Sequence, residues 1–461
     1  MKNYYSNYLI AILLLMTTFL NAQNYSIGHK TITYNDPART GGYGSGGGTG
    51  RQIQCEIYYP STTTGNNTPL ASGNFPIIVF GHGFFMSWDA YTNIWEHYVA
   101  DGYILAFPRT EGGLSPNHLD FGKDLIIAAN KLESNCNTST DFFYNSWNGK
   151  IAVMGHSMGG GASFLSASDY NSSFDVLVGL APAETTPSAI SASKLIDIPT
   201  IILSGTEDAV TPPDQHHQLM YDSLSTSICK QFVSIIGGGH CYFANSNTAC
   251  DFGESTSGGN ISIDRLTQQD IMFDVLVPWL AFYLKNDCSQ WTPFLTELSA
   301  DVRLIGTNGC SYQTPIVPVI VENNNTLSIS SNLNIQWFLN GQSLANEVND
   351  TLNSLLYGNG DYSVSVTDSI GCSKFSDTLT IAGLGFRTLD LSVIKIAPNP
   401  CSDFIQIDLK GENAAIEIID AFGRVVQMHE KSTGLLDVSN LKSGYYTLKS
   451  GNRISTKIIK L

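Results

Sequence analysis

Two patterns of hydrophobic and polar positions follow one another along the chain. Up to about residue 295, short and almost continuously apolar runs alternate with longer amphipathic stretches. Such runs are typical of strands buried on both faces of a parallel sheet, so repeated strand–helix units predict a doubly wound α/β fold. The predicted strands are 75–80, 102–107, 150–155, 174–182, 199–205 and 232–238. The predicted helices include 91–101, 119–134, 158–169 and 214–227.

From about residue 300 the pattern changes to strict alternation between Asn/Gly turns. LNIQWFLNGQSLA (333–345), GDYSVSVTDSIGCSKF (360–375) and IEIIDAFGRVV (416–426) all follow it. This alternation is typical of half-buried antiparallel strands. We therefore expect an α/β domain with a mostly parallel sheet, followed by two small all-β sandwich domains. The expected boundaries are 24–295 for the first domain, 300–384 for the second and 390–461 for the third.

The first 23 residues have the pattern of a secretory signal peptide. Lys2 precedes an apolar stretch from Tyr8 to Leu20, and small residues precede Gln23. We predict cleavage after Ala22 or Gln23 and export of the chain. The apolar stretch is short for a bilayer span, so we expect no stable membrane span; a retained anchor is the alternative.

The cysteines fit an exported protein. There are nine, and export permits disulfides, whereas the absence of CxxC spacing argues against a zinc site. The odd number leaves at least one cysteine unpaired. We expect the pairs Cys241–Cys250 and Cys310–Cys372.

Charge excludes one class of partner. The net charge of −16 without any Lys/Arg run would repel a phosphate backbone, so we expect no nucleic-acid partner. The segment GGYGSGGGTG (41–50) precedes a strand and not a helix, so we interpret it as a flexible loop and not as a phosphate cradle. We expect a monomer.

The segment GHSMG (155–159) lies between the predicted strand 150–155 and the predicted helix 158–169. A serine with glycines two residues away on each side suits the sharp turn of a nucleophile elbow, which lifts Oγ above the sheet edge. The N-terminus of the following helix stabilises negative charge that develops there. We therefore predict that Ser157 is a catalytic nucleophile; an ordinary Gly-rich turn is the alternative.

A nucleophilic serine needs a base and a group that orients the base. In α/β-hydrolases the chain order is serine, acid, histidine. Asp208 follows the predicted strand 199–205, and His240 lies on a Gly-rich loop after the strand 232–238. Both stand at carboxyl ends of strands, the edge where open α/β sheets build their sites. We predict the triad Ser157–Asp208–His240.

Other residues compete for these roles. Glu184 follows the preceding strand and is an alternative acid, whereas we interpret Glu207 as a solvated neighbour of Asp208. His216 and His217 lie on a predicted helix, and we expect both to face solvent. His156 lies inside the elbow, where we expect a packing or hydrogen-bonding role and not that of the base.

Acyl transfer also needs two backbone N–H donors for the oxyanion. The residue after the nucleophile, Met158, supplies one, and Phe84 in the HGF turn after the first strand supplies the other. We expect His82 to support that turn. In the predicted reaction Ser157 attacks an ester carbonyl, His240 transfers the proton, and water hydrolyses the acyl-enzyme. This mechanism requires no metal and no organic cofactor.

Around the predicted triad the chain resembles cutinase-like polyester hydrolases, the family that includes poly(ethylene terephthalate)-degrading enzymes. The similarity covers roughly residues 70–285 and rests on GHSMGGGAS, EDAVTP and IIGGGHCYFANS. It implies that Phe84 takes the aromatic oxyanion position and that Phe84, Trp95 and Val210 contact substrate. The chain departs from the family at Thr186, where a tryptophan is expected, and in a longer loop after His240.

Two further resemblances concern the all-β regions. IQWFLNG, GDYSVSVTD and GCS resemble immunoglobulin-like or PKD-like modules, for which we expect a spacer role. APNP (397–400), IEIIDAFGRVV, LKSGYYTL and TKIIK resemble the C-terminal sorting domain of type IX secretion substrates. This resemblance implies the type IX machinery as a partner and an extracellular or cell-surface location.

The sequence thus predicts a secreted serine carboxylic-ester hydrolase that acts on polymeric esters such as cutin or poly(ethylene terephthalate). The alternatives are a lipase, a small-ester or lactone hydrolase, or a peptidase of the same fold. A non-catalytic adhesion protein on a hydrolase scaffold is the remaining hypothesis.

Overall fold

The structure is a computed structural model that describes residues 24–169, 172–226, 229–310, 312–382, 395–408, 415–430, 434–450 and 453–461. The predicted signal peptide, residues 1–23, lies outside the described residues. The chain divides into two compact units, which we describe separately. The first unit extends to Ile316 and includes Val366–Lys374; the second comprises Val317–Ser365 and Phe375–Leu461.

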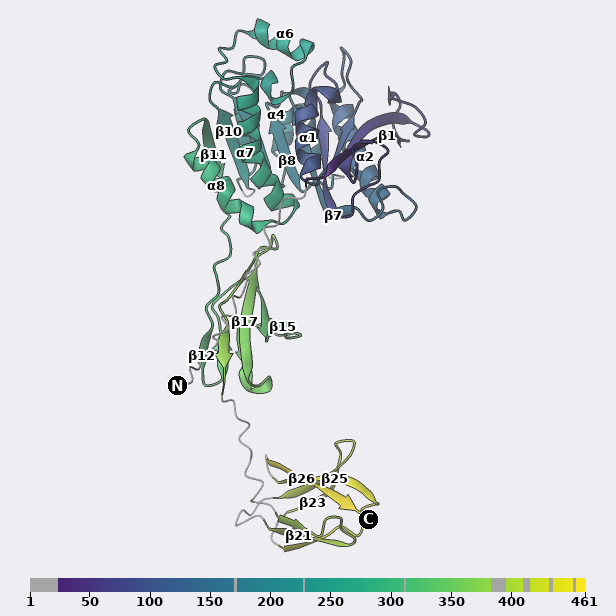
Figure 1. Cartoon of the computed structure of the whole chain (residues 1–461), viewed down its shortest axis with the longest axis vertical. Helices are drawn as coiled ribbons and strands as arrows, with labels where there is room; N and C mark the ends of the chain where they lie inside the picture. The colour runs from purple at the N-terminus through teal and green to yellow at the C-terminus, as the bar shows by residue number, and fades with distance from the viewer. Residues whose placement is uncertain are drawn as a thin grey trace, which may run out of the picture. The chain divides into compact units, whose positions relative to one another are not determined.

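In the described part of the first unit, the central element is an eleven-stranded mixed sheet (Figure 1). Its order is β11-β10-β9-β8-β7-β5-β6-β3-β1-β4, with β2 paired to β3. The run from β6 through β5, β7, β8 and β9 to β10 is parallel, whereas β3 and β11 pair antiparallel at its two sides. The strands are β1 (Ser26–Asp36), β2 (Gly42–Tyr43), β3 (Arg51–Ser61), β4 (Gly65–Asn66), β5 (Phe75–Gly81), β6 (Ile104–Pro108), β7 (Trp147–His156), β8 (Val176–Leu180), β9 (Thr200–Gly205), β10 (Lys230–Ile235) and β11 (Leu304–Gly309).

Helices cover both faces of this sheet, and Figure 1 shows α1 and α7 in front of the strands and α6 at the upper end of the unit. Along β5, Ile78 and Phe80 belong to the core under α1, α7 and α8, whereas Ile77 and Val79 belong to the core under α2 and α3. Burial on both faces explains why the central parallel strands are almost continuously apolar, and the predicted α/β fold is confirmed. The helices are α1 (Thr92–Ala100), α2 (His118–Asn137), α3 (Met158–Ala167), α4 (Ala189–Ser193), α5 (His217–Ser223), α6 (Thr248–Ser257), α7 (Arg265–Leu284) and α8 (Trp291–Ala300).

Three disulfides join Cys229–Cys310, Cys241–Cys250 and Cys288–Cys372. The predicted pair Cys241–Cys250 is confirmed, and the predicted pair Cys310–Cys372 is wrong. Antiparallel pairing of β10 with β11 sets Lys230 opposite Gly309, so Cys229 and Cys310 are neighbours one position further along. The sequence does not reveal this because β11 and β10 are separated by about 70 residues of helical chain. The remaining cysteines in the described part, Cys55, Cys136 and Cys401, are buried and unpaired.

The second unit consists of small antiparallel sheets, as the alternating pattern predicted. In its last part, Ile405, Ile416, Leu448 and Ile458 form a core between two sheets. No helix in the described part of the chain is long and apolar enough to cross a membrane. The strands are β12 (Val321–Asn323), β13 (Thr326–Ser328), β14 (Asn334–Leu339), β15 (Gln342–Ser343), β16 (Thr351–Asn353), β17 (Gly360–Thr367), β18 (Ser373–Phe375), β19 (Leu379–Ile381), β20 (Lys395–Ala397), β21 (Phe404–Asp408), β22 (Ile416–Asp420), β23 (Val425–His429), β24 (Gly434–Asp437), β25 (Gly444–Ser450) and β26 (Arg453–Lys460).

Candidate active site

Ser157 occupies a sharp turn between β7, which ends at His156, and α3, which begins at Met158. Its backbone has φ 55° and ψ −123°, a conformation that non-glycine residues rarely adopt. A Cβ at Gly155 would overlap the backbone of Gly159, and a Cβ at Gly159 would overlap that of Gly81. Glycine is therefore required on both sides of the serine, which gives the GxSxG spacing a steric reason.

His240 lies between Ser157 and Asp208, the two other residues of the predicted triad. Its Nε2 is 2.9 Å from the Ser157 Oγ, and its Nδ1 is 2.8 Å from the Asp208 Oδ2. Asp208 follows β9 and His240 follows the neighbouring strand β10, so parallel pairing brings their loops to one edge. All three side chains are buried, with the serine 8% exposed. The arrangement can pass a proton from the serine hydroxyl to an imidazole whose other nitrogen is held by a carboxylate.

Hydrogen bonds hold the Asp208 carboxylate in place. Its Oδ1 accepts the N–H groups of Val210 and Thr211 at 3.0 and 2.7 Å, and its Oδ2 accepts the Thr211 hydroxyl at 2.9 Å. Burial alone would raise the pKa of Asp208, yet the adjacent His240 and these hydrogen bonds keep the pKa below its ordinary value of 3.8. The carboxyl group is therefore ionised at neutral pH.

His156 uses both ring nitrogens in other contacts. Its Nε2 lies 3.0 Å from the backbone oxygen of His240, and because a carbonyl only accepts, this nitrogen donates. Its Nδ1 accordingly accepts from the Tyr91 hydroxyl at 2.9 Å, and that hydroxyl accepts the Gly83 N–H at 2.8 Å. Burial lowers the pKa of His156 to about 3. The predicted hydrogen-bonding role is confirmed: this histidine links the loop after β5 to the backbone of His240.

The expectation that His217 faces solvent is wrong. Its side chain is fully buried, with Nδ1 2.8 Å from the Ser204 Oγ and Nε2 3.0 Å from the Thr211 Oγ1. Burial lowers its pKa to about 3. His216 is half-buried, and its Nδ1 accepts the Glu184 N–H at 2.9 Å. The sequence does not show which of two adjacent histidines on a helix faces inward. The contact of His217 with Thr211, next to Asp208, was therefore not predicted.

The competing carboxylates lie elsewhere. The Glu184 Oε2 accepts the Ile190 N–H at 2.9 Å in the first turn of α4, and Glu207 is only half-buried. A carboxylate that the sequence did not single out, Glu254 of α6, accepts hydrogen bonds from the backbone N–H groups of His240 and Cys241. Among the described residues, the carboxylate bonded to the imidazole of His240 is that of Asp208.

The loop after β5 borders the serine turn. His82 lies with its Nδ1 2.9 Å from the Gly83 oxygen and its Nε2 2.9 Å from the Thr110 oxygen, so it supports the turn as expected. Phe84 follows with its side chain 48% exposed, and Met158 is buried. Their assignment as oxyanion donors stays a prediction.

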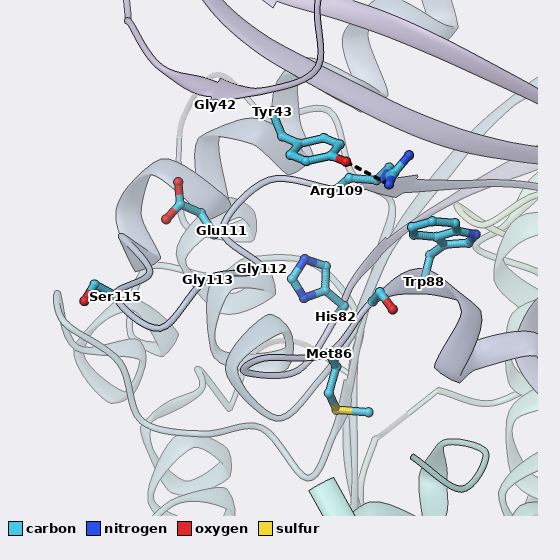
Figure 2. A pocket seen from close by; sticks show the side chains of 11 residues that line it. Gly42, Tyr43, His82, Met86, Trp88, Arg109, Glu111, Gly112, Gly113 and Ser115 are labelled. Atoms are coloured by element: carbon cyan, nitrogen blue, oxygen red, sulfur yellow. Dashed lines mark hydrogen bonds between the residues drawn. The ribbon is translucent and has the colours of Figure 1, made fainter. Parts of the chain in front are cut away.

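A recess of about 480 Å³ lies beside this loop and is lined by residues that include His82, Met86, Glu111 and Gly112. Figure 2 shows these residues around it. Arg109 lies between two aromatic rings there, 4.6 Å from the centroid of Tyr43 and 4.2 Å from that of Trp88. The Tyr43 hydroxyl accepts from the guanidinium at 3.0 Å, so the glycine-rich segment is fastened to the sheet at this point (Figure 2).

The two other predicted substrate contacts differ in their surroundings. Val210 is half-buried in the Asp208 loop, two residues from the acid. Trp95 of α1 stacks on Tyr58 of β3 at 4.1 Å between ring centroids and packs against the core. The contacts of Trp95 are those of a core residue, and its role toward substrate stays a prediction.

The mixed sheet, the serine turn after its strand β7 and the helices on both faces define an α/β-hydrolase. Residues 20–295 match the model of the "PET hydrolase-like" family, so the chain belongs to that family. Residues 395–461 match the secretion system C-terminal sorting domain. The chain is therefore exported through the type IX secretion system to the cell surface or the extracellular space.

Curated relatives share low identity with the chain. Chlorophyllase-1 of Citrus sinensis is 26% identical over 187 residues, 36% of this chain and 55% of that protein. Cutinase 2 of Thermobifida cellulosilytica is 26% identical over 220 residues, 46% of this chain and 72% of that protein. The bis(hydroxyethyl) terephthalate hydrolase of Streptomyces coelicolor is 25% identical over 205 residues, 44% of this chain and 58% of that protein. The chain thus spans about half the length of the first and third of these relatives.

Proposed function

We propose that this protein is a secreted serine hydrolase of carboxylic esters, with Ser157 as nucleophile, His240 as base and Asp208 as the orienting acid. The observation that carries the proposal is the continuous hydrogen-bonded relay, 2.9 Å from serine to imidazole and 2.8 Å from imidazole to carboxylate. It begins at a serine held in a strained turn, the feature that exposes a nucleophile above a sheet.

In the proposed reaction the Ser157 Oγ attacks the ester carbonyl while its proton moves to the His240 Nε2. The N–H groups of Met158 and Phe84 bind the resulting oxyanion, and Asp208 stabilises the imidazolium without taking its proton. The imidazolium protonates the departing alkoxide, which leaves as an alcohol. A water molecule then attacks the acyl-enzyme while giving a proton to His240, and His240 returns that proton to the Ser157 Oγ as the acid leaves.

The proposed substrates are polymeric esters, such as cutin or poly(ethylene terephthalate). The names of two relatives, a cutinase and a bis(hydroxyethyl) terephthalate hydrolase, support this substrate class. Phe84 and Val210 are proposed substrate contacts beside the relay, and Trp95 is proposed from the family resemblance. We propose residues 24–295 for catalysis, 300–384 for a spacer and 390–461 for sorting, except that β11 (Leu304–Gly309) pairs with β10 in the sheet of the first unit.

Substitution of the nucleophile tests the mechanism. We expect Ser157→Ala to lower kcat on a p-nitrophenyl ester by at least about 10³-fold, because the residual rate then comes only from the oxyanion donors and binding. Ser166→Ala is the matched control, because it removes a serine hydroxyl from α3, the helix that follows Ser157. Among the described residues this hydroxyl donates to the backbone oxygens of Ala162 and Ser163. Turnover that persists in Ser157→Ala would contradict the assignment, and an inactive wild type would favour the adhesion hypothesis.

A substrate panel tests the second part of the proposal. Release of soluble acids from cutin and from a poly(ethylene terephthalate) film is compared with hydrolysis of short-chain p-nitrophenyl esters, triglycerides, lactones and a peptide. Turnover of the polymers supports a polyester hydrolase. Activity confined to one of the other substrates would identify a lipase, a small-ester or lactone hydrolase, or a peptidase of the same fold.

A further inference from the structure

Glu254 is a buried carboxylate that the reaction described above does not use. It lies on α6, in the longer loop that follows the base, and is 8% exposed. One carboxylate oxygen accepts the N–H of His240, and the other accepts the N–H of Cys241 at 3.1 Å. A Cβ at Gly239 would collide with the first oxygen, so the carboxylate reaches the backbone because that position is a glycine.

Burial raises the pKa of Glu254, while the two backbone N–H groups favour its ionised form. A buried carboxylate is costly unless hydrogen bonds compensate for lost solvation, so these two donors are what keeps the side chain in place. The dependence is mutual, because without Glu254 two buried N–H groups beside the base would lack an acceptor.

Other backbone groups next to the base are also bonded by side chains. Gln268 of α7 bonds both the N–H and the oxygen of Gly239 at 2.9 Å, and Arg265 donates to the Cys241 oxygen at 2.5 Å. His156 donates to the His240 oxygen at 3.0 Å. Gln268 and His156 are neutral and Arg265 is a cation. Glu254 therefore supplies the anionic acceptor for the two N–H groups at the base.

We propose that Glu254 is a positioning residue for the base and acts through the backbone of His240. Its carboxylate fixes the peptide groups on both sides of the His240 Cα, and this holds the imidazole in line between Asp208 and Ser157. The inference rests on the proposed function, since it assigns Glu254 a part in the same proton transfer. A displacement of about 1 Å in such a relay can lower the rate by about 10²-fold.

The test is the kinetics of Glu254→Gln on a soluble p-nitrophenyl ester, with rates expressed per active site by titration with a phosphonate inhibitor. The amide of glutamine can accept only one of the two N–H groups. We expect kcat to fall by about 10- to 100-fold while KM stays within about twofold, because substrate contacts are untouched. Asp274→Asn is the control: it neutralises a carboxylate of α7 that bonds Arg303 and not the loop of His240.

Two further measurements keep the inference falsifiable. Hydrogen exchange at the His240 and Cys241 amides becomes faster in Glu254→Gln if their acceptor is weakened. Should that variant fail to fold, Glu254→Asp retains the charge with one methylene less, and a kcat below that of the wild type is expected. An active wild type with unchanged kcat in the folded variant, or an equal loss in Asp274→Asn, overturns this inference alone. An inactive wild type overturns the proposed function and this inference with it.

Discussion

At the scale of residues, two buried histidines flank the proposed relay without being part of it. His156 contacts the backbone of the base, and His217 contacts Thr211, whose hydroxyl also bonds Asp208. Burial lowers the pKa of each from 6.5 to about 3. Both rings are therefore neutral in the folded protein at pH values where the unfolded chain already protonates them.

This difference predicts a loss of stability in acid. Because the folded pKa lies below the unfolded value, the unfolded state binds more protons between about pH 6.5 and pH 3. The stabilising contribution is fully present above pH 6.5 and is lost as the pH falls through this window, by up to about 1.4 kcal/mol per pH unit for each histidine.

The measurement is urea denaturation of the first unit, followed by tryptophan fluorescence at intervals from pH 7 to pH 4. We expect the free energy of unfolding to decrease steadily toward pH 4. His156→Gln keeps a donor and an acceptor at this position but cannot be protonated, so its stability should depend less on pH than that of the wild type. An identical pH dependence in the two proteins would argue against a buried neutral His156.

At the scale of elements, α6 connects the loop of the base to the rest of the first unit. The disulfide Cys241–Cys250 ties the residue after the base to the first turn of this helix, and Asn247 caps the helix by accepting the Cys250 N–H at 3.0 Å. The helix has few strong helix formers, so these tertiary restraints stabilise it more than its own propensity does.

We predict that removal of the disulfide Cys241–Cys250 measurably destabilises the folded protein. The bond closes a loop with a sequence separation of 9, for which the loss of unfolded-chain entropy corresponds to about 2–3 kcal/mol. We expect the double variant Cys241→Ala, Cys250→Ala to lower the free energy of unfolding by this amount under non-reducing conditions. Cys136→Ala removes a buried thiol without any cross-link and measures the packing contribution. A double variant no less stable than this control would refute the prediction.

The secondary structure could be predicted where burial is regular. The parallel strands were predicted because helices cover both faces of the sheet, which leaves few polar positions in the runs. Helix α5 is shorter than the predicted 214–227 and begins at His217. The chain first makes a turn at Pro212 and Pro213, in which the N–H groups of Gln215 and His216 both donate to the Pro212 oxygen. From the sequence, the segment that forms α6 was predicted only as a longer loop, because its composition does not indicate a helix.

At the scale of the whole molecule, the proposed catalytic residues and the sorting region lie in different units of the chain. Ser157, Asp208 and His240 belong to the first unit, and residues 395–461, which match the sorting domain, belong to the second. The proposed hydrolysis and the export therefore depend on separate parts of the sequence.

Deletion of residues 395–461 separates the two functions. In a bacterium that has the type IX system, we expect the truncated chain to remain in the periplasm while the full chain reaches the surface or the medium. The purified truncated chain should retain kcat on a soluble ester within about twofold, because no triad contact is lost. Fractionation with immunoblotting and an esterase assay on each fraction measure both effects. A truncated chain that still appears in the medium would contradict the expected role of this region.

The sequence by itself determined the features that depend on neighbouring residues. Gly155 follows from steric contact with Gly159 within one turn, and the apolar runs follow from burial of each strand. The tertiary structure decided which distant groups meet: His217 against the acid, Cys229 against Cys310, and Glu254 against the backbone of the base. These contacts depend on which strands are neighbours and how the loops fold over them, and one-dimensional spacing does not carry that information.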